Sequence, residues 1–242
     1  MTTASTAPPS TGFRHFHEQL TELKQRLLDM SARAEELVDV AMDGLRYRDT
    51  SKAEAVIAHD SEIDALEIEI EHRAIALLAL QQPMAKDLRF IVGAIKISSD
   101  LERVGDHAVN IAQATLRLRG TSTALAHSPA PEIEDMARRA RKMLGDALDA
   151  FIRADGALGR AVCAADDEVD ALHESIFRVL LTHMMENPST ISAALQFLLV
   201  SRNLERVADL ATNIGEDAVF LAEGKQIKHH FEDRPPPRRD AT

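Results

Sequence analysis

A twelve-residue segment that occurs twice places the strongest constraint on this chain. The first copy, LERVGDHAVNIA, covers residues 101–112, and the second, LERVADLATNIG, covers residues 204–215. Eight of the twelve positions are identical at a constant offset of 103 residues. The repetition indicates an internal duplication, so each half of the chain is expected to fold in the same way.

Each copy carries an acidic stripe. Residues four apart stack on one face of a helix, and two acids at that spacing weaken a bare helix by a few tenths of a kcal/mol. A repeated unfavourable stripe that ends in an amide oxygen favours a bound cation. Carboxylate and amide oxygens suit hard cations such as magnesium, and carboxylates also bind iron, nickel or zinc. The alternative is a solvated acidic face. The residues concerned are Glu102, Asp106, Asn110, Glu205, Asp209 and Asn213.

The composition and periodicity predict an all-α fold. Apolar residues make up 45% of the chain, but aromatic residues only 4%, and 28% are charged, a profile typical of helical proteins. Apolar positions recur at spacings of three and four. They predict helices over about 13–48, 49–82, 83–119, 132–154, 157–187 and 188–224, with Leu66 and Leu80 in the core stripe of the second and Leu88 at an apolar position of the third. Asp49 is expected to cap the second helix, and Pro83 and Pro188 to open the third and sixth.

Two copies of one unit account for this order of helices. Short connections make neighbouring helices antiparallel, so each unit is expected to be a three-helix bundle, and the fold two tandem three-helix bundles related by the internal repeat. The predicted boundaries are a disordered tail at 1–12, a first repeat at 13–120, a linker at 121–131, a second repeat at 132–224 and a disordered tail at 225–242.

A second acidic stripe follows the second helix of each unit, where DSEIDAL at 60–66 matches DDEVDAL at 166–172. In antiparallel neighbours the two stripes could converge on one groove, where four carboxylates would repel unless protonated or bound to a metal. His173 takes the place of Glu67 and could add a nitrogen ligand or be an ordinary surface histidine. Arg103 and Arg206 are expected to face away from the acids and to link helices. The additional candidate metal ligands are Asp60, Asp64, Asp166 and Asp170.

Charge and missing motifs exclude several classes of function. A net charge of −11 disfavours nucleic acid as the partner. No apolar run approaches the roughly 20 residues needed to span a bilayer, so direct membrane insertion is not expected. The start of the chain lacks the features of a signal peptide, which favours the cytoplasm. Cys163 is the one cysteine, so a cysteine-based zinc site is excluded.

The sequence does not favour an enzyme. No glycine-rich phosphate loop, Gly-x-Ser-x-Gly or His-Glu-x-x-His motif occurs. The one Glu-x-x-His spacing, Glu69 to His72, is expected on the polar side of its helix, unlike the inward motifs of di-metal oxidases. Two alternatives to a metal-binding adaptor stay open, namely a carboxylate-bridged metalloenzyme or metal store, and a helical adaptor without metal.

The two motif copies, the 60–66 signature and the QPMAKDLR segment at 82–89 together resemble the PhoU family over about residues 13–224. The resemblance implies a cytoplasmic accessory protein of the high-affinity phosphate ABC transporter and a negative regulator of the phosphate-starvation response. Its implied partners are the transporter's ATPase subunit and the phosphate-sensing histidine kinase. Either a monomer or a homodimer fits the sequence.

The resemblance also implies multinuclear metal clusters, often iron or zinc, on the bundle surface. The Glu-x-x-x-Asp pairs of the family are Glu102 with Asp106 and Glu205 with Asp209 in this chain. One departure concerns the second repeat, which has NPSTI at 187–191 in place of the fuller 82–89 segment. If Lys86, Asp87 and Arg89 contact a partner, only the first repeat does so.

Overall fold

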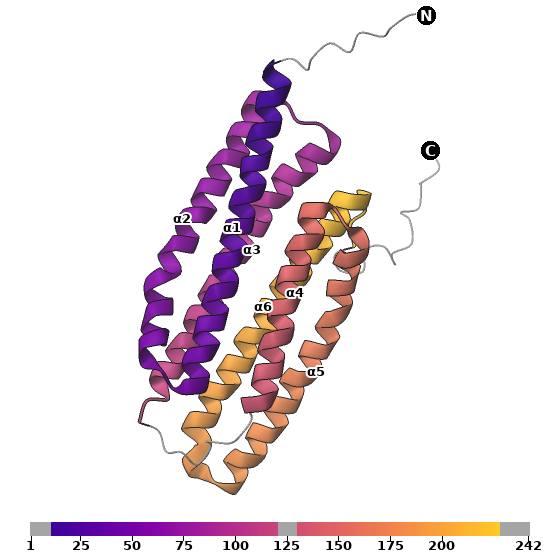
Figure 1. Ribbon diagram of the computed structural model, residues 1–242. Coiled ribbons are helices and arrows are strands. Elements are labelled where there is room, and N and C mark those ends of the chain that lie inside the picture. Colours follow the sequence, from indigo (N-terminus) through magenta and orange to yellow (C-terminus); the bar gives the residue numbers. More distant parts are fainter. Residues whose placement is uncertain (1–10, 121–129, 228–242) are drawn as a thin grey trace, which may run out of the picture.

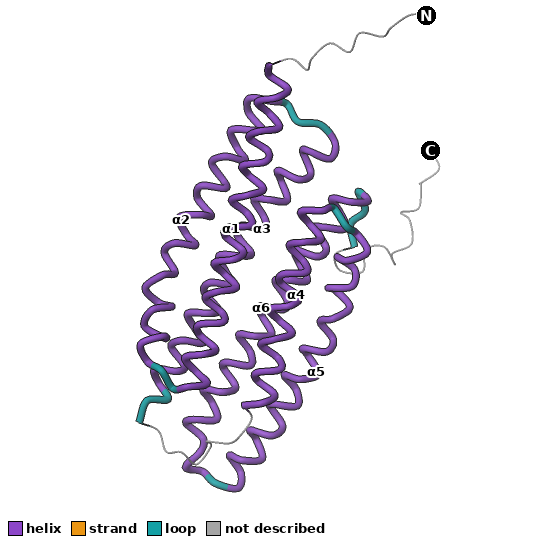
Figure 2. Tube along the Cα trace, in the orientation of Figure 1, coloured by secondary structure: helices purple, strands orange, loops and turns teal. Residues whose placement is uncertain are grey.

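Six long helices make up nearly all of the computed structural model, which describes residues 11–120 and 130–227. No strand occurs in these two ranges, so the all-α prediction is confirmed, and Figure 2 shows loops confined to short turns between the helices. The predicted tails fall largely on residues 1–10 and 228–242, and the predicted linker on 121–129, outside the described residues. The helices are α1 (Thr11–Tyr47), α2 (Thr50–Gln81), α3 (Ala85–Arg117), α4 (Ala130–Arg153), α5 (Gly156–Glu186) and α6 (Ile191–Glu223), with the short 3-10 helix η2 (Pro188–Thr190) before α6.

The helices form two three-helix bundles that lie side by side (Figure 1). Within each bundle every helix packs against the other two. The bundles join through α3 against α6 and, less extensively, through α1 against α4. Figure 1 shows α2 and α5 at the two outer edges, and the α2–α3 and α5–α6 turns at opposite ends of the molecule. The tandem three-helix architecture predicted from the repeat is therefore the observed one.

Equivalent caps begin the second helix of each repeat. The Asp49 carboxylate accepts hydrogen bonds from the backbone N–H groups of Ser51 and Lys52, at 2.9 and 3.3 Å. Asp155 accepts in the same way from Ala157 and Leu158, both at 3.0 Å. These bonds satisfy donors that have no partner inside the helix. The prediction that Asp49 caps α2 is confirmed, and the second repeat uses the same device.

The start of the third helix differs from the prediction. Pro83 does not occupy the first turn, because α3 begins at Ala85, after a turn in which Gln82 and Ala85 both have positive φ. Pro188 does open a helical segment, since η2 runs directly into α6. The fourth helix begins at Ala130, so Pro131 lies in its first turn and not in a linker.

A continuous apolar core runs through both bundles. Phe151 of α4 lies over Gly93 of α3, where a Cβ would come within 2.6 Å of the ring, and it stacks on Phe90 at a centroid distance of 5.0 Å. An aromatic side chain from the second repeat thus fills a space that a glycine leaves in the first. This packing joins the cores of the two repeats.

Two residues expected at apolar positions of the second and third helices are exposed. Leu80 and Leu88 are 73% and 41% exposed, whereas Leu66 is half-buried and packs against the core. Leu80 lies beyond Leu77, the last buried residue of α2, and Leu88 lies before Phe90, the first buried residue of α3. The periodicity continues to both helix ends, but the neighbouring helices do not cover them there.

Every helix within residues 11–120 and 130–227 falls short of the apolar length that a membrane crossing requires.

Candidate metal centres

The first group of acids gathers where α2 crosses the motif of α3. A Cβ added at Gly105 would lie 3.2 Å from Asp60 Oδ1 and 3.1 Å from Ile63 Cδ1. Gly105 therefore allows the Asp60 carboxylate to come close to the α3 backbone, one residue before Asp106. The acidic stripes of α2 and α3 therefore come together at this crossing.

Electrostatic coupling extends this first group to five carboxylates. Burial raises the pKa of Asp60, and the charges of Asp64 and Asp106 raise it further. Burial likewise raises the pKa of Glu102, with additional contributions from Asp106 and Glu67. Each carboxylate disfavours ionisation of its neighbours, as expected for like charges in one patch. We call Asp60, Asp64, Glu67, Glu102 and Asp106 the first carboxylate cluster.

A second carboxylate cluster occupies the equivalent place between α5 and α6 and consists of Asp166, Asp170, Glu205 and Asp209. Burial raises the pKa of Asp166 to about 6, and the charges of Asp170 and Asp209 add to this effect. Burial and the charge of Asp209 also raise the pKa of Asp170. Asp166 Oδ1 is buried without a hydrogen-bond partner, which is costly for an ionised oxygen. A cation bound at this atom would remove that cost.

A contact between two glycines determines the spacing of α5 and α6 beside the second cluster. A Cβ at Gly159 would lie 2.6 Å from the Gly215 carbonyl oxygen, and a Cβ at Gly215 would lie 2.9 Å from the Gly159 oxygen. No other residue type allows the two backbones to approach this closely. Gly159 lies two turns before Asp166, so the glycine pair brings the acids of α5 toward those of α6.

The arginines of the motif behave differently in the two repeats. Arg206 pairs with Asp209 at 2.8 Å, so the expectation that it faces away from the acids was wrong. Arg103 instead pairs with Asp100, whose Oδ1 is 3.5 Å from Arg103 Nη1. Asp209 is thus held by a cation of its own helix, whereas Asp106 forms no ion pair with any residue in 11–120 or 130–227. A metal ion at the second cluster would have to compete with Arg206 for Asp209.

The remaining candidate ligands lie at the margins of the clusters. Asn110 is exposed and Asn213 is half-buried. The His173 ring packs against α6, with Nδ1 3.1 Å from Ser201 Oγ. A further contact that the sequence did not indicate joins the repeats, where His107 Nδ1 lies 2.9 Å from Asn203 Oδ1. Because Asn203 donates its amide hydrogen to the Leu199 carbonyl, its oxygen is free to accept from His107.

The geometry constrains what these groups can do chemically. As placed, the described side chains include no group of three or more His, Cys, Asp or Glu residues that could hold a metal ion. Ligation at either cluster therefore requires the carboxylates to turn inward around a cation. Burial raises the pKa of Cys163 to about 11, which keeps the thiol protonated and unreactive.

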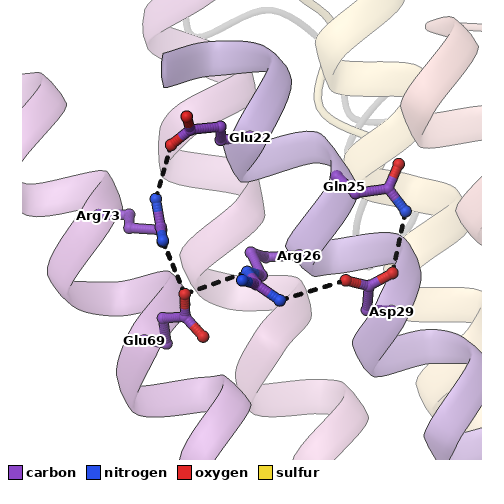
Figure 3. A network of polar contacts seen from close by, with 6 residues as sticks. All are labelled: Glu22, Gln25, Arg26, Asp29, Glu69 and Arg73. Carbon is purple, nitrogen blue, oxygen red and sulfur yellow. Dashed lines mark hydrogen bonds and ion pairs between the residues drawn. The ribbon is translucent and has the colours of Figure 1, made fainter. Parts of the chain in front are cut away.

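The one Glu-x-x-His spacing does not form a metal site. Glu69 accepts from Arg73 at 2.8 Å and pairs with Arg26 at 3.1 Å, in a network of polar contacts that ties α2 to α1 (Figure 3). Arg73 extends the network to Glu22. His72 is exposed. The Glu69 carboxylate is therefore used for interhelical ion pairs, as the expected polar position implied.

Replacing Asp166, whose Oδ1 atom is buried, is expected to stabilise the metal-free protein. The folded-state pKa of Asp166, about 6, lies above its ordinary value of 3.8, so the ionised carboxylate costs stability above pH 6 and not below about pH 4. Discounted for partial exposure, this cost is about 1–2 kcal/mol. Asp166→Asn should raise the Tm at pH 7.5 in chelator by about 3–6 °C, measured by circular dichroism.

The matched control for this change is Asp167→Asn, because Asp167 is exposed and adjacent. The Tm of Asp167→Asn should equal that of the unmodified protein at pH 7.5 and at pH 4. The advantage of Asp166→Asn should largely disappear at pH 4, where the native carboxyl is protonated in the folded state and about half protonated in the unfolded state. An equal gain at pH 4 and pH 7.5 would contradict the electrostatic explanation.

Comparison with known proteins matches both repeats. The PhoU domain matches residues 27–115 and 133–218. The chain is 41% identical over 213 residues to the phosphate-specific transport system accessory protein PhoU homolog of Clostridium acetobutylicum, covering 88% of this chain and 96% of that protein. It is 38% identical to the homolog of Aquifex aeolicus, covering 88% and 95%.

Two solved structures share the fold. The crystal structure of PhoU from Pseudomonas aeruginosa aligns with a TM-score of 0.81 and 34% identity, covering 87% of this chain and all of that chain. The phosphate transport system regulatory protein PhoU from Streptococcus pneumoniae aligns with a TM-score of 0.79 and 30% identity, covering 87% and 98%. With two PhoU domains in tandem and relatives matched along nearly their whole length, this chain belongs to the PhoU family.

Proposed function

We propose that this protein is an accessory protein of a high-affinity phosphate transporter and a negative regulator of the phosphate-starvation response. The observation that carries the proposal is the match of both repeats to accessory proteins of phosphate-specific transport systems, over 88% of this chain and 96% of the Clostridium protein. In this role it works in the cytoplasm and contacts the transporter's ATPase subunit and the phosphate-sensing histidine kinase. It acts by contact and not by turnover, either as a monomer or as a homodimer.

We further propose that the two carboxylate clusters bind metal ions. The buried, unpartnered Asp166 Oδ1 and the raised pKa values of Asp60, Glu102 and Asp166 support this, because each is relieved by a cation. The first cluster, with Asn110, offers oxygen donors alone; in the second, Asn213 and His173 stand beside the acids. Oxygen donors fit magnesium, iron, zinc or nickel. A bound ion would neutralise the repulsion and hold α2 to α3 and α5 to α6.

Deleting the gene is expected to leave the starvation-response genes expressed when phosphate is abundant. A negative regulator that connects transporter and kinase is needed to report sufficiency, so its loss leaves the response switched on. Alkaline phosphatase activity and transcript levels in high-phosphate medium measure the effect. Expression from a plasmid should restore repression, and normal repression in the deletion strain would count against the proposal.

A further inference from the structure

An apolar ridge is exposed on the second repeat, near the α5–α6 turn. Each of its six large side chains is at least 40% exposed, and Met185 is 78% exposed. On both helices the members are spaced by four residues, so each set occupies one face. The ridge consists of Phe177, Leu181 and Met185 on α5 and Ile191, Leu195 and Leu199 on α6.

The two halves of the ridge lie on the same side of the α5–α6 pair. His173 contacts Ser201 across the two antiparallel helices, as Gly159 contacts Gly215. Continuing that register brings Phe177 and Leu181 level with the 193–197 turn of α6, which carries Leu195. Phe177 follows Asp170 by seven residues and therefore lies on the face of the second carboxylate cluster. The ridge and the cluster thus share one face of the α5–α6 pair.

The first repeat shows that the fold does not require three of the six ridge residues. At the equivalent positions of α2 and α3, Glu71 stands for Phe177, Ala79 for Met185 and Lys96 for Leu199. The other three equivalent positions keep exposed apolar residues, namely Ile75, Leu88 and Val92. The first repeat forms the same three helices with these residues in place. The three-helix fold therefore does not require large apolar side chains at the positions of Phe177, Met185 and Leu199 in the second repeat. Exposed apolar surface of this kind is typical of interaction sites.

The charge next to the ridge restricts what can cover it. The second cluster contributes four carboxylates to the same face, against the guanidinium groups of Arg202 and Arg206 on α6. Arg206 is already engaged by Asp209. A second copy placed on this face would bring one acidic cluster toward another, in a chain of net charge −11. In the metal-free protein, like charges across an interface cost several kcal/mol, whereas basic side chains would be attracted.

We propose that this face is the docking site for an amphipathic helix of a partner protein, with apolar side chains on the ridge and Lys or Arg at the end that meets the carboxylate cluster. An amphipathic helix that lays its apolar face on an apolar surface is a recurrent mode of recognition. The inference rests on the proposed function, since it locates a partner's contact on the second repeat alone. The first repeat keeps part of the apolar surface, but Glu71 and Lys96 place charges where the second repeat has Phe177 and Leu199.

The test returns the ridge to the residues of the first repeat, in the triple variant Phe177→Glu, Met185→Ala and Leu199→Lys. The probes are a fluorescent helical peptide of Leu and Lys and its Leu and Glu counterpart, titrated by anisotropy in chelator. The full-length protein should bind the Lys peptide at least about tenfold more tightly than the triple variant does. It should also bind the Lys peptide more tightly than the Glu peptide.

The control is Leu80→Lys, because Leu80 is an exposed apolar residue near the α2–α3 turn, at the opposite end of the molecule (Figure 1). It should bind the Lys peptide as the unmodified protein does. Equal binding by the triple variant, or equal binding of both peptides, would overturn the proposal. So would a dimer that the triple variant dissociates in light scattering. Leu199→Lys alone provides the same comparison if the triple variant melts below the unmodified protein.

Binding to the purified ATPase subunit and kinase separates this inference from the proposed function. If the unmodified protein binds neither, the proposed function fails, whatever the peptide result. If it binds one of them and the triple variant binds that partner equally well, the docking site is wrong while the proposed function stands. If the unmodified protein binds one of these partners and the triple variant does not, the result supports both the docking site and the proposed function.

Discussion

Gly159→Val is expected to lower the free energy of unfolding by at least about 3 kcal/mol, the upper end of the usual cost of overpacking. Even a Cβ at this position would lie 2.6 Å from the Gly215 carbonyl oxygen and 3.1 Å from Val219 Cγ2. Backbone cannot turn away as a side chain can, so α5 has to move off α6. For a chain of this length the Tm should fall by about 6–12 °C, measured by calorimetry.

Gly145→Val makes the same substitution where there is room. A Cβ at Gly145 meets only the Glu35 carboxylate, at 3.8 Å, and valine is at least as good a helix former as glycine. Its stability should stay within about 0.5 kcal/mol of the unmodified protein. A similar loss in both variants would show that the close approach of α5 to α6 does not explain the effect.

If the two carboxylate clusters bind metal as proposed, the quadruple variant Glu102→Ala, Asp106→Ala, Glu205→Ala and Asp209→Ala should contain less metal than the unmodified protein. Mutation of residues that only hydrogen-bond a metal ligand already lowers metal affinity by about 10–100-fold. Removing two carboxylates from each cluster should therefore weaken binding by at least about a hundredfold. Elemental analysis of protein purified without added metal, followed by calorimetric titration with iron, zinc, nickel and magnesium salts, measures the change and identifies the ion.

A second quadruple variant removes the same charge elsewhere, by replacing exposed acids with alanine at Glu18, Glu54, Asp149 and Glu186. Its metal content should match that of the unmodified protein, which separates ligation from a general effect of net charge. Equal metal content in the unmodified protein and the first quadruple variant would contradict the ligand assignment. In chelator the first quadruple variant should have a Tm no lower than that of the unmodified protein, because its substitutions remove carboxylates that repel one another.

The helices, the repeat and the acidic stripes could be predicted from the sequence because each depends on local spacing. Each of these signals lies within one helical turn or one helix: the 3.6-residue period of the apolar positions, the Asp49 cap, and each copy of the motif. Helix ends were less accurate, as with Ala85 in place of Pro83 and the exposed Leu80. At an end, the coverage by neighbouring helices decides burial, and periodicity carries no information about it.

The relation between the two repeats could not be predicted, because it depends on how segments about a hundred residues apart pack together. Only the tertiary structure brings His107 to Asn203, Lys96 to the buried Asp217 and Phe151 over Gly93. It also decides that Arg206, but not Arg103, holds an acid of its own motif. The sequence by itself determined the elements and which faces carry charge. Packing between backbones, set by glycines and interlocking side chains, decided which faces meet and which stay open for a partner.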